Sequence, residues 1–445
     1  MKTIFITSFY QYISRNILKT PILDGLLGVP DLRIVIIVPK DKKNFFEEEF
    51  KGRKIIIESV DISRSANGFL SLFLTRVSRG MLGVRYKEVA RGFKVNKFRD
   101  GLIRTLFYLP LRILGKFYLM HDLMRWFNLK LLKNKAHNDL FDKYSPDIVF
   151  STDVYNENDV LMATEAKRRK IKIISMIRSW DNVQMYGVIR VIPDELLLWG
   201  DFVKDEVLKF NKIDPSILEI VGVPHYDRYL KGSTMSREEF FNSIGADISK
   251  KLIFFTPVGD MYLKKNDVDG LVLSILSELD ANILVRMPPA DNVSWGNSKP
   301  ASNIFFYQPG RAGKKLGRNE IDREDDDHLI NSIYFSDVVI SGPSTIMLDA
   351  LMINKPVVLF GFESQKKVYK DSILSLYDSH HLQAVIKNCG AYLAKNIGDF
   401  RSKISEYIQD PKKDQEIRDK VVNYICFKKD GRSSQRVFEI INKYI

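Results

Sequence analysis

One segment constrains the fold of this chain more than any other: residues 335–363, FSDVVISGPSTIMLDALMINKPVVLFGFE. Its apolar spacing predicts a short buried strand over 337–340, a helix over 346–352 and a second strand over 357–360. The Gly-Pro pair and the hydroxyl residues around it predict a tight turn between the first strand and the helix. Strand, turn, helix and strand in this order form the repeating unit of a parallel α/β sheet.

The turn in this segment predicts an anion-binding site. Such a turn directs free backbone N–H groups and the positive end of a helix dipole at one spot, where phosphate is the usual ligand. Asp349 lies four residues beyond Thr345 on the same helix face, from which its carboxylate would accept hydrogen bonds from the vicinal hydroxyls of a ribose. The alternative is an ordinary helix cap followed by a surface acid. The predicted nucleotide-donor residues are Ser341, Gly342, Pro343, Ser344, Thr345 and Asp349.

Apolar strand candidates alternate with helical stretches along the rest of the chain. They span residues 3–7, 33–38, 54–59, 147–151, 172–177, 195–199 and 219–221, and then 252–256, 282–286 and 304–307. A chain of 445 residues exceeds one ordinary core. We therefore predict two α/β domains with doubly wound parallel sheets, over 1–235 and 236–445, with the junction in the polar stretch 227–249. Ligands bind at the carboxyl ends of strands in such sheets, and we expect those ends to face a central cleft.

The positive charge of the chain is concentrated in one region. The net charge is +13, and residues 64–135 contain 16 Lys or Arg and three acids, which accounts for the whole surplus. We predict that this region is a basic, helical insertion in the first domain. Arg104, Arg112 and Lys116 interrupt its most apolar stretch, which argues against a membrane-spanning helix. Two interpretations stay open: an amphipathic surface that rests on anionic lipid, or a helical insertion with solvated charges.

The cysteine content and the first residues predict the cellular compartment of the protein. The two cysteines, Cys389 and Cys426, provide neither a disulfide framework nor metal-ligand spacing, as expected in a reducing cytosol. The first residues, MKTIFITSFY, lack the long apolar core of a signal peptide, so we expect no export. No recognised nucleic-acid module accompanies the basic charge, so we expect no nucleic-acid partner. The predicted localisation is cytoplasmic and peripheral, on the inner face of the cell membrane.

The segment 335–363 resembles the donor-binding motif of GT-B glycosyltransferases, in particular bacterial surface-polysaccharide transferases and the related CDP-glycerol glycerophosphotransferases. Similar landmarks extend the resemblance over most of the chain: SRNIL at 14–18, SWDN at 179–182, VGVPHYD at 221–227 and RMPPAD at 286–291. Two positions depart from the family pattern, because the family more often has Glu in place of Asp349 and a residue other than Pro289. The resemblance implies a GT-B fold, in which two Rossmann-like domains face a cleft and the second binds the nucleotide donor.

Further donor-binding residues follow strand ends of the second domain. Arg286 ends one strand, where its guanidinium would pair with donor phosphates, the alternative being a surface salt bridge. Thr256 ends another strand and would shape the same pocket, the alternative being a loop role. The resemblance implies that Glu363 and Gln365, after the last strand of the motif, contact hydroxyls of the donor's sugar.

The resemblance places the general base and the acceptor in the first domain. The candidate bases are Asp181, Asp153 and His225, and we favour Asp181 because the indole beside it would remove water from its carboxylate. The alternative for both aspartates is a turn-forming role, and for His225 a hydrogen bond to the interdomain linker. The predicted acceptor-binding residues are Arg15, Asn16, Trp180 and Asn182. For Arg15 and Asn16 the alternatives are that they close on the donor phosphates or that they brace their own loop.

Four consecutive acids, Glu324 to Asp327, suggest a metal site at first sight. Contiguous carboxylates point in different directions, whereas a metal ion needs convergent ligands. Capping of a helix that starts near His328 is the better account. GT-B enzymes generally rely on helix dipoles and cations, so the resemblance also implies no metal ion and no cofactor, the nucleotide-sugar donor being a co-substrate.

The predicted function is transfer of a sugar from a nucleotide-activated donor to an acceptor hydroxyl in surface-polysaccharide or related glycan biosynthesis. The acceptor would be a glycan or a lipid-linked glycan. A CDP-glycerol-type polyol-phosphate transferase is an alternative, although those relatives rely on cleft histidines and this chain has six histidines in all. A nucleotide-sugar 2-epimerase would need further acids and a histidine around the helix turn, which residues 344–347 lack. A non-catalytic, membrane-associated scaffold on a GT-B fold is the last alternative.

Overall fold

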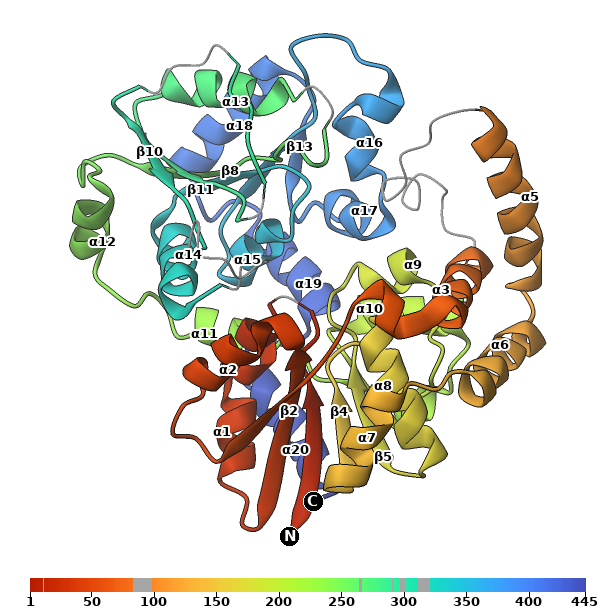
Figure 1. Ribbon diagram of the computed structural model, residues 1–445. Coiled ribbons are helices and arrows are strands. Elements are labelled where there is room, and N and C mark those ends of the chain that lie inside the picture. Colours follow the sequence, from red (N-terminus) through yellow and green to blue (C-terminus); the bar gives the residue numbers. More distant parts are fainter. Residues whose placement is uncertain (11, 83–97, 264–265, 290, 297–300, 311–320) are drawn as a thin grey trace. The chain divides into compact units, whose positions relative to one another are not determined.

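The chain folds into two compact units, described here from a computed structural model (Figure 1). The structure describes residues 1–10, 12–82, 98–263, 266–289, 291–296, 301–310 and 321–445. Unit 1 comprises Met1–His225, Ile425–Phe427 and Arg432–Ile445, and unit 2 comprises Tyr226–Tyr424 and Lys428–Gly431. These units differ from the predicted division after residue 235 in two respects. The first boundary falls after His225, and the C-terminal residues belong to unit 1, because the last helix of the chain packs on its N-terminal part.

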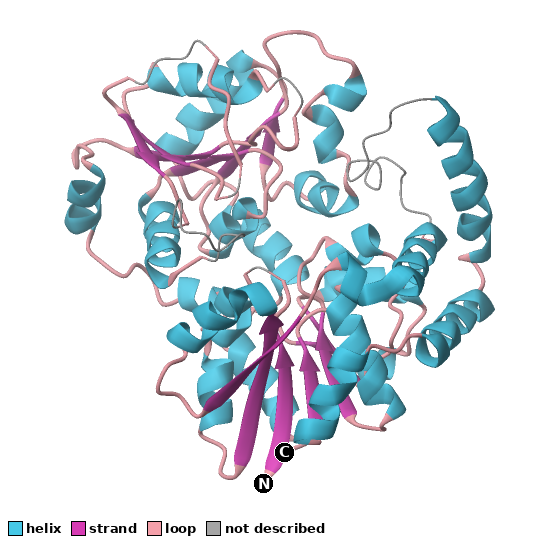
Figure 2. Ribbon diagram, viewed as in Figure 1, coloured by secondary structure: helices cyan, strands magenta, loops and turns pink. Residues whose placement is uncertain are grey.

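Unit 1 is built on a parallel sheet of seven strands in the order β3-β2-β1-β4-β5-β6-β7. The strands are β1 (Lys2–Thr7), β2 (Leu32–Pro39), β3 (Ile55–Val60), β4 (Ile148–Ser151), β5 (Lys172–Met176), β6 (Glu195–Leu198) and β7 (Leu218–Ile220). Neighbouring positions such as Ile4 and Phe5 point to opposite faces of the sheet, and both are fully buried. Burial on both faces requires helices on both sides, which explains why the strands are continuously apolar (Figure 2).

The helices of unit 1 cover this sheet and add a peripheral layer. They are α1 (Pro21–Leu27), α2 (Lys43–Glu49), α3 (Arg64–Met81), α5 (Phe98–Leu114), α6 (Tyr118–Leu131), α7 (Lys135–Tyr144), α8 (Glu157–Arg168), α9 (Asn182–Tyr186), α10 (Asp201–Asn211) and α20 (Ser433–Asn442). One face of the sheet forms a core with α7 and α8, in which Phe5 and Val149 meet Phe141 and Met162. Helix α20 packs on α1, which fixes the C-terminus to the N-terminal half of the chain.

Unit 2 has a parallel sheet of six strands in the order β10-β9-β8-β11-β12-β13. The strands are β8 (Leu252–Thr256), β9 (Asn282–Arg286), β10 (Ile304–Tyr307), β11 (Val338–Ser341), β12 (Val357–Phe360) and β13 (Tyr392–Ala394). The predicted strands of both halves are present. Strand β13 was not predicted, because three residues with one buried side chain carry no recognisable period.

The helices of unit 2 are α11 (Tyr226–Tyr229), α12 (Arg237–Ile244), α13 (Val268–Ser277), α14 (Arg323–Phe335), α15 (Ile346–Met352), α16 (Leu374–Tyr377), α17 (His380–Lys387), α18 (Ile397–Gln409) and α19 (Gln415–Cys426). Helix α15 occupies the residues predicted for it. Helix α12 begins with a capping box between Ser236 and Glu239. The prediction that α14 starts near His328 was wrong: it starts at Arg323, and Asp322 caps it by accepting a hydrogen bond from the Asp325 amide.

The basic region forms the peripheral helices α3, α5 and α6 and the start of α7, as predicted for a helical insertion, while residues 83–97 lie outside the described part of the chain. Among the described residues, no helix combines the length and the apolar character that crossing a membrane requires. Helix α3 contains a kink at Gly68, whose φ of 75° lies in the left-handed region.

A buried carboxyl group lies beneath the carboxyl ends of β1 and β4. Asp159 of α8 is fully buried, and its Oδ1 accepts hydrogen bonds from the Thr7 hydroxyl and, at 3.2 Å, from the Ser151 hydroxyl. Within the described residues its Oδ2 has no hydrogen-bond partner. Burial raises the pKa of Asp159 to about 7. The folded state therefore keeps a proton that the unfolded chain loses near pH 4, so the free energy of unfolding falls as the pH rises between about 4 and 7.

Replacing Asp159 with Asn should remove this pH dependence, because an amide does not ionise. We expect Asp159→Asn to raise the free energy of unfolding by on the order of 4 kcal/mol at about pH 8 and to change it little at about pH 3.5, where the carboxyl group is protonated in both states. Urea denaturation at the two pH values measures this. Asp142→Asn, which changes an exposed carboxylate of α7, is the matched control and should keep the wild-type pH slope. A wild-type slope in Asp159→Asn itself would contradict the assignment.

Candidate functional site

Four side chains form a row along the carboxyl edge of the unit 2 sheet. Ser341 of β11 is paired in register with Thr256 of β8, and Arg286 of β9 is paired with Tyr307 of β10. The register between β8 and β9 continues from Phe255 and Val285, so the row runs Ser341, Thr256, Arg286 and Tyr307. The Thr256 hydroxyl donates to the Ser341 hydroxyl oxygen over 2.9 Å. The structure therefore brings three predicted donor residues, which are far apart in sequence, to adjacent strand ends.

The turn after β11 packs tightly against the loop after β8. A Cβ atom on Gly342 would lie 2.4 Å from Val258 Cγ2, so only glycine fits at this position. The loop itself is held by Asp269, which accepts hydrogen bonds of 2.9 Å from the amides of both Val258 and Gly259. Desolvation raises the pKa of Asp269. The two loops next to the row are thus fixed by packing and by a buried acid.

The predicted anion turn continues into α15. Thr345 occupies the N-cap position without a capping bond from its side chain, while the Ser344 hydroxyl accepts a hydrogen bond of 3.4 Å from the Ile346 amide. Pro343 and Ser344 are half-buried, and Thr345 is exposed. Asp349 is buried one turn further along α15, and its amide donates to the Thr345 carbonyl over 3.3 Å. The hydroxyl groups and the carboxylate thus lie along one short helix, as predicted.

Arg286 is fixed by an aromatic and polar cluster. Its Nη2 donates to the Asp325 carbonyl over 3.1 Å, and its Nη1 lies 3.4 Å from His328 Nδ1. The His328 and Tyr307 rings stack with centroids 3.4 Å apart, and the Tyr307 hydroxyl donates to the Asp325 carboxylate over 2.8 Å. Burial, followed by the charge of Arg286, lowers the pKa of His328 to about 3. The imidazole is therefore neutral at physiological pH, so Nδ1 accepts from Arg286 and orients its guanidinium.

Glu363 and Gln365 have different surroundings. The Glu363 carboxylate accepts a hydrogen bond of 3.0 Å from the Ile373 amide and lies 3.6 Å from the Lys367 ammonium. These contacts tie the loop after β12 to the start of α16. Gln365 is exposed on the same loop. Glu363 therefore has structural partners in this loop, and the sugar contact of Glu363 and Gln365 stays a prediction.

The acidic run 324–327 is engaged in separate contacts. Asp325 accepts from Tyr307 and, over 2.8 Å, from the Gly310 amide, while Asp326 pairs with Arg228 at 2.6 Å and Asp327 pairs with the same guanidinium. In the part of the chain that the structure describes, no group of three or more His, Cys, Asp or Glu converges as metal ligands would. The cap of α14 is Asp322, just before the run, and the three aspartates of the run take part in hydrogen bonds and ion pairs.

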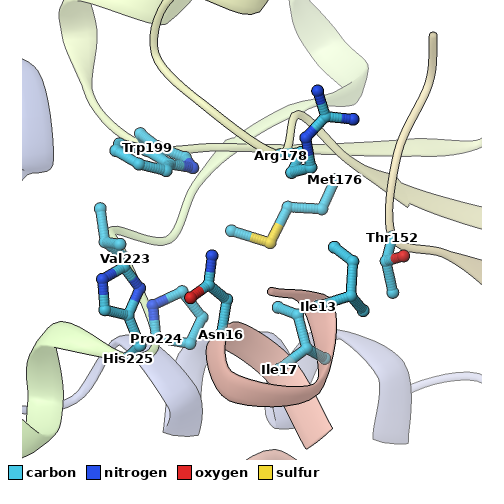
Figure 3. Close-up of a pocket in the computed structure, with 10 residues that line it drawn as sticks. All are labelled: Ile13, Asn16, Ile17, Thr152, Met176, Arg178, Trp199, Val223, Pro224 and His225. Carbon is cyan, nitrogen blue, oxygen red and sulfur yellow. The ribbon is translucent and has the colours of Figure 1, made fainter. Parts of the chain in front are cut away.

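Unit 1 has a small pocket at the carboxyl edge of its own sheet (Figure 3). Its lining comes from the π-helix Ser14–Leu18 and from the ends of β4, β5, β6 and β7. The lining residues are Ile13, Asn16, Ile17, Thr152, Met176, Arg178, Trp199, Val223, Pro224 and His225. The pocket volume is about 10 Å³, close to what one water molecule needs. Of the predicted residues, Asn16 and His225 line it.

The Arg178 side chain is the centre of the charged groups at this edge. It forms an ion pair with Asp153, and its guanidinium lies 3.6 Å from the centroid of the Tyr10 ring. Asp153 is fully buried, and its Oδ1 also accepts a hydrogen bond of 2.9 Å from the Tyr155 amide. A buried carboxylate that is paired in this way favours a structural role over that of a general base.

The SWDN segment follows β5 and contributes to the core. Trp180, which was predicted to contact the acceptor, is buried and packs at 6.3 Å against the Phe202 ring, because its large apolar surface is removed from water there. Asn182 is buried in α9, and its amide donates to the Asp181 carboxylate over 3.0 Å. Asp181 is half-buried and does not line the pocket. Trp180, Asp181 and Asn182 therefore lie outside the pocket lining, and the two buried residues contribute to the core of unit 1.

Arg15 is predicted to bind the acceptor but braces its own loop in this structure. Its Nε donates to the Asn16 side-chain oxygen over 2.9 Å, and its guanidinium lies 5.8 Å from the centroid of the Tyr12 ring. These contacts hold the Asn16 side chain beside the pocket.

Sequence reasoning missed three residues of the two edges: Arg178, Tyr307 and His328. Arg178 and Tyr307 could have been found, since each lies at or just after the end of a predicted strand. His328 had no such signal, because its place beside Arg286 depends on how α14 packs against β9 and β10.

Solved structures with the same fold cover the whole chain. A glycosyltransferase from Rickettsia africae is 15% identical, with 99% of each chain covered and a TM-score of 0.52. UDP-GlcNAc 2-epimerases from Neisseria meningitidis and Methanocaldococcus jannaschii are 12% and 14% identical, with 100% of each chain covered and TM-scores of 0.55 and 0.53. Identities this low show the fold alone, and that fold is GT-B, as the resemblance implied.

The sequence itself matches one family. No curated protein matches this chain. The family profile for CDP-Glycerol:Poly(glycerophosphate) glycerophosphotransferase matches residues 208–443, which is just over half of the chain and includes the whole row of Ser341, Thr256, Arg286 and Tyr307. This chain therefore belongs to the CDP-glycerol:poly(glycerophosphate) glycerophosphotransferase family.

Proposed function

We propose that this protein transfers a sugar from a nucleotide-activated donor to an acceptor hydroxyl in surface-polysaccharide or related glycan biosynthesis. The acceptor is a glycan or a lipid-linked glycan, and the reaction takes place at the inner face of the cell membrane. The observation that carries the proposal is the row at the carboxyl edge of unit 2, where hydroxyls, an oriented guanidinium and a tight glycine turn meet inside the region matched by a transferase family.

The row supplies what a nucleoside diphosphate needs. In the proposal, Arg286 binds the phosphates, and its contacts with a carbonyl and a neutral imidazole orient it without adding negative charge. The amides and hydroxyls of Ser344 and Thr345 bind a phosphate oxygen, and Asp349 binds the ribose hydroxyls. As the bond between the sugar's anomeric carbon and the diphosphate breaks, the departing oxygen gains charge that Arg286 stabilises.

Unit 1 supplies the acceptor half in this proposal. His225 lines the pocket beside Asn16 and Arg178, whereas Asp153 is paired with Arg178 and Asp181 lies outside the lining. We therefore assign the general base to His225 in place of Asp181. A ring nitrogen of His225 takes the proton of the acceptor hydroxyl while its oxygen bonds to the anomeric carbon and the nucleoside diphosphate leaves with the electron pair.

A second function shares the same donor site. The family match favours transfer of a polyol phosphate from a CDP-linked donor, in which the acceptor oxygen attacks the distal phosphorus and CMP leaves. The full-length fold similarity to a glycosyltransferase and to UDP-GlcNAc epimerases favours a nucleotide sugar. The identity of the bound nucleotide distinguishes the two functions.

A thermal-shift panel of UDP, GDP, CDP and CMP with their sugar and alditol conjugates tests the donor site. Binding to the folded state raises the melting temperature, by an amount equivalent to about 2.7 kcal/mol at a ligand concentration of 100 times Kd. We expect one nucleotide series to raise it. Asp349→Ala should weaken the binding of that nucleotide by at least about tenfold, because hydrogen bonds to a charged group contribute roughly 1.5–3 kcal/mol.

Asp280→Ala is the matched control, since it removes an exposed carboxylate just before β9, at the opposite edge of the same sheet. It should leave the shift unchanged. A rise in melting temperature with UDP- or GDP-sugars supports sugar transfer. A rise with CDP-alditols and CMP supports polyol-phosphate transfer. No shift from any nucleotide, with wild-type behaviour of Asp349→Ala, would favour the non-catalytic scaffold.

The base assignment has its own test. With the donor identified above, His225→Ala should lower kcat by about 100- to 10,000-fold, the usual contribution of a general base, while nucleotide binding is retained. Asp181→Asn should have a much smaller effect. The reverse order of the two variants would return the role to Asp181 and show that the pocket is not the acceptor site.

A further inference from the structure

Helices α5 and α6 lie at the periphery of unit 1 (Figure 1). From Leu106 on, many of their exposed side chains are apolar, where a surface helix is normally polar. Leu106 and Leu119 are 66% and 71% exposed, and Trp126 is 52% exposed. We call the whole set the outer apolar face: Leu106, Phe107, Leu109, Ile113, Leu114, Phe117, Tyr118, Leu119, Leu123, Trp126, Phe127 and Leu131. Twelve exposed apolar side chains on two consecutive helices and the turn between them indicate an interaction site.

The inner face of α6 is anchored, so the outer apolar face does not result from a loosely placed helix. Met124 and Asn128 are buried, and the Asn128 amide donates to the Thr164 hydroxyl over 3.0 Å. The Arg125 guanidinium donates to the Asn211 carbonyl over 2.6 Å. These contacts fix the rotation of α6 about its axis and leave Leu119, Leu123 and Trp126, which are spaced by about one helical turn, on the opposite side.

The turn between the two helices is fixed to α3. A Cβ atom on Gly115 would lie 1.8 Å from the Met81 carbonyl oxygen, so the turn contacts the end of α3 through backbone alone. His121 Nε2 donates to the Gly115 carbonyl over 2.8 Å. These contacts fix the turn that precedes Phe117 and Tyr118, and both of these side chains are exposed to solvent.

Cations border the outer apolar face. Between residues 106 and 133 the chain has five Lys or Arg and one acid, Asp122, which is bonded to Arg125 at 3.0 Å. Lys116, Lys130 and Lys133 are exposed. Aromatic and aliphatic side chains with basic residues beside them match the boundary of a bilayer that carries anionic head groups.

We propose that the outer apolar face is an interfacial docking surface for an anionic lipid bilayer, with α5 and α6 lying in the head-group region. A second copy of this chain fits less well, since pairing two such faces would bring their cations together. The inference deepens the proposed function and rests on it only for the nature of the acceptor, because a lipid-linked acceptor is presented at such a boundary.

Helix α3 connects this surface to the pocket edge of unit 1. The Arg79 guanidinium of α3 lies 5.6 Å from the centroid of the Tyr186 ring, and Arg178, which lines the pocket, lies 5.5 Å from the same centroid. The support on which α5 and α6 rest therefore also contacts the edge proposed to receive the acceptor.

Vesicle sedimentation of the full chain tests the proposal without nucleotide or acceptor. We expect binding to phosphatidylcholine vesicles that contain phosphatidylglycerol, and weaker binding to phosphatidylcholine alone or at high salt. Leu119→Ser with Leu123→Ser should reduce binding at least about tenfold, because both side chains lose their apolar burial. Lys130→Gln with Lys133→Gln should reduce it about fivefold per charge on anionic vesicles only.

Ile248→Ser with Ile397→Ser is the matched control, since both isoleucines are exposed in unit 2. It should bind like the wild type, and circular dichroism verifies that all variants are folded. Absent vesicle binding, or equal binding by Leu119→Ser with Leu123→Ser, overturns the proposal. A lipid-independent dimer that this variant abolishes, seen by sedimentation velocity, also overturns it and assigns the face to a second copy. Because the thermal-shift panel needs no vesicles, failure of either proposal is recognised separately.

Discussion

Burial of both faces of each parallel sheet is the constraint on which the rest of this structure depends. Adjacent residues such as Ile4 and Phe5 point to opposite faces and are both inaccessible, so helices must cover both sides. Parallel strands then require a crossover after each strand, and every strand ends at the same edge. Backbone and polar groups reach solvent at that edge, which is why the sites proposed here, in unit 1 and in unit 2, follow strand ends.

Buried charges at these edges determine what each edge can do. In unit 1 the Asp153 carboxylate is paired with Arg178, which offsets the cost of burying either ion and makes Asp153 a support. In unit 2 the Arg286 guanidinium is oriented by the Asp325 carbonyl and by His328, whose pKa is lowered by burial. Both arginines lie at the carboxyl edge of a sheet, but their neighbours differ. These neighbours suit Arg178 to shaping a pocket and Arg286 to the phosphate binding proposed for it.

Strand positions were predictable because buried parallel strands are short apolar runs bounded by polar residues, as in 252–256 and 338–341. The turn between β11 and α15 was predictable for the same reason, since Gly342 and the hydroxyl residues follow such a run directly. The start of α14 was predicted too late, because its first turn is acidic and lacks an apolar period. The burial of Trp180 was not predictable, since an indole beside a polar segment suits either a ligand or the core, and local sequence does not distinguish them.

The sequence by itself determined the parallel α/β architecture, the glycine turn before α15 and the concentration of basic charge in the peripheral helices, because each depends on local spacing. The tertiary structure alone decided which side chains meet. The stacking of His328 on Tyr307, the pairing of Asp153 with Arg178 and the outward rotation of Leu119 and Trp126 depend on contacts between distant segments. Those contacts follow from how helices pack on sheets and on one another, and no local pattern of residues encodes them.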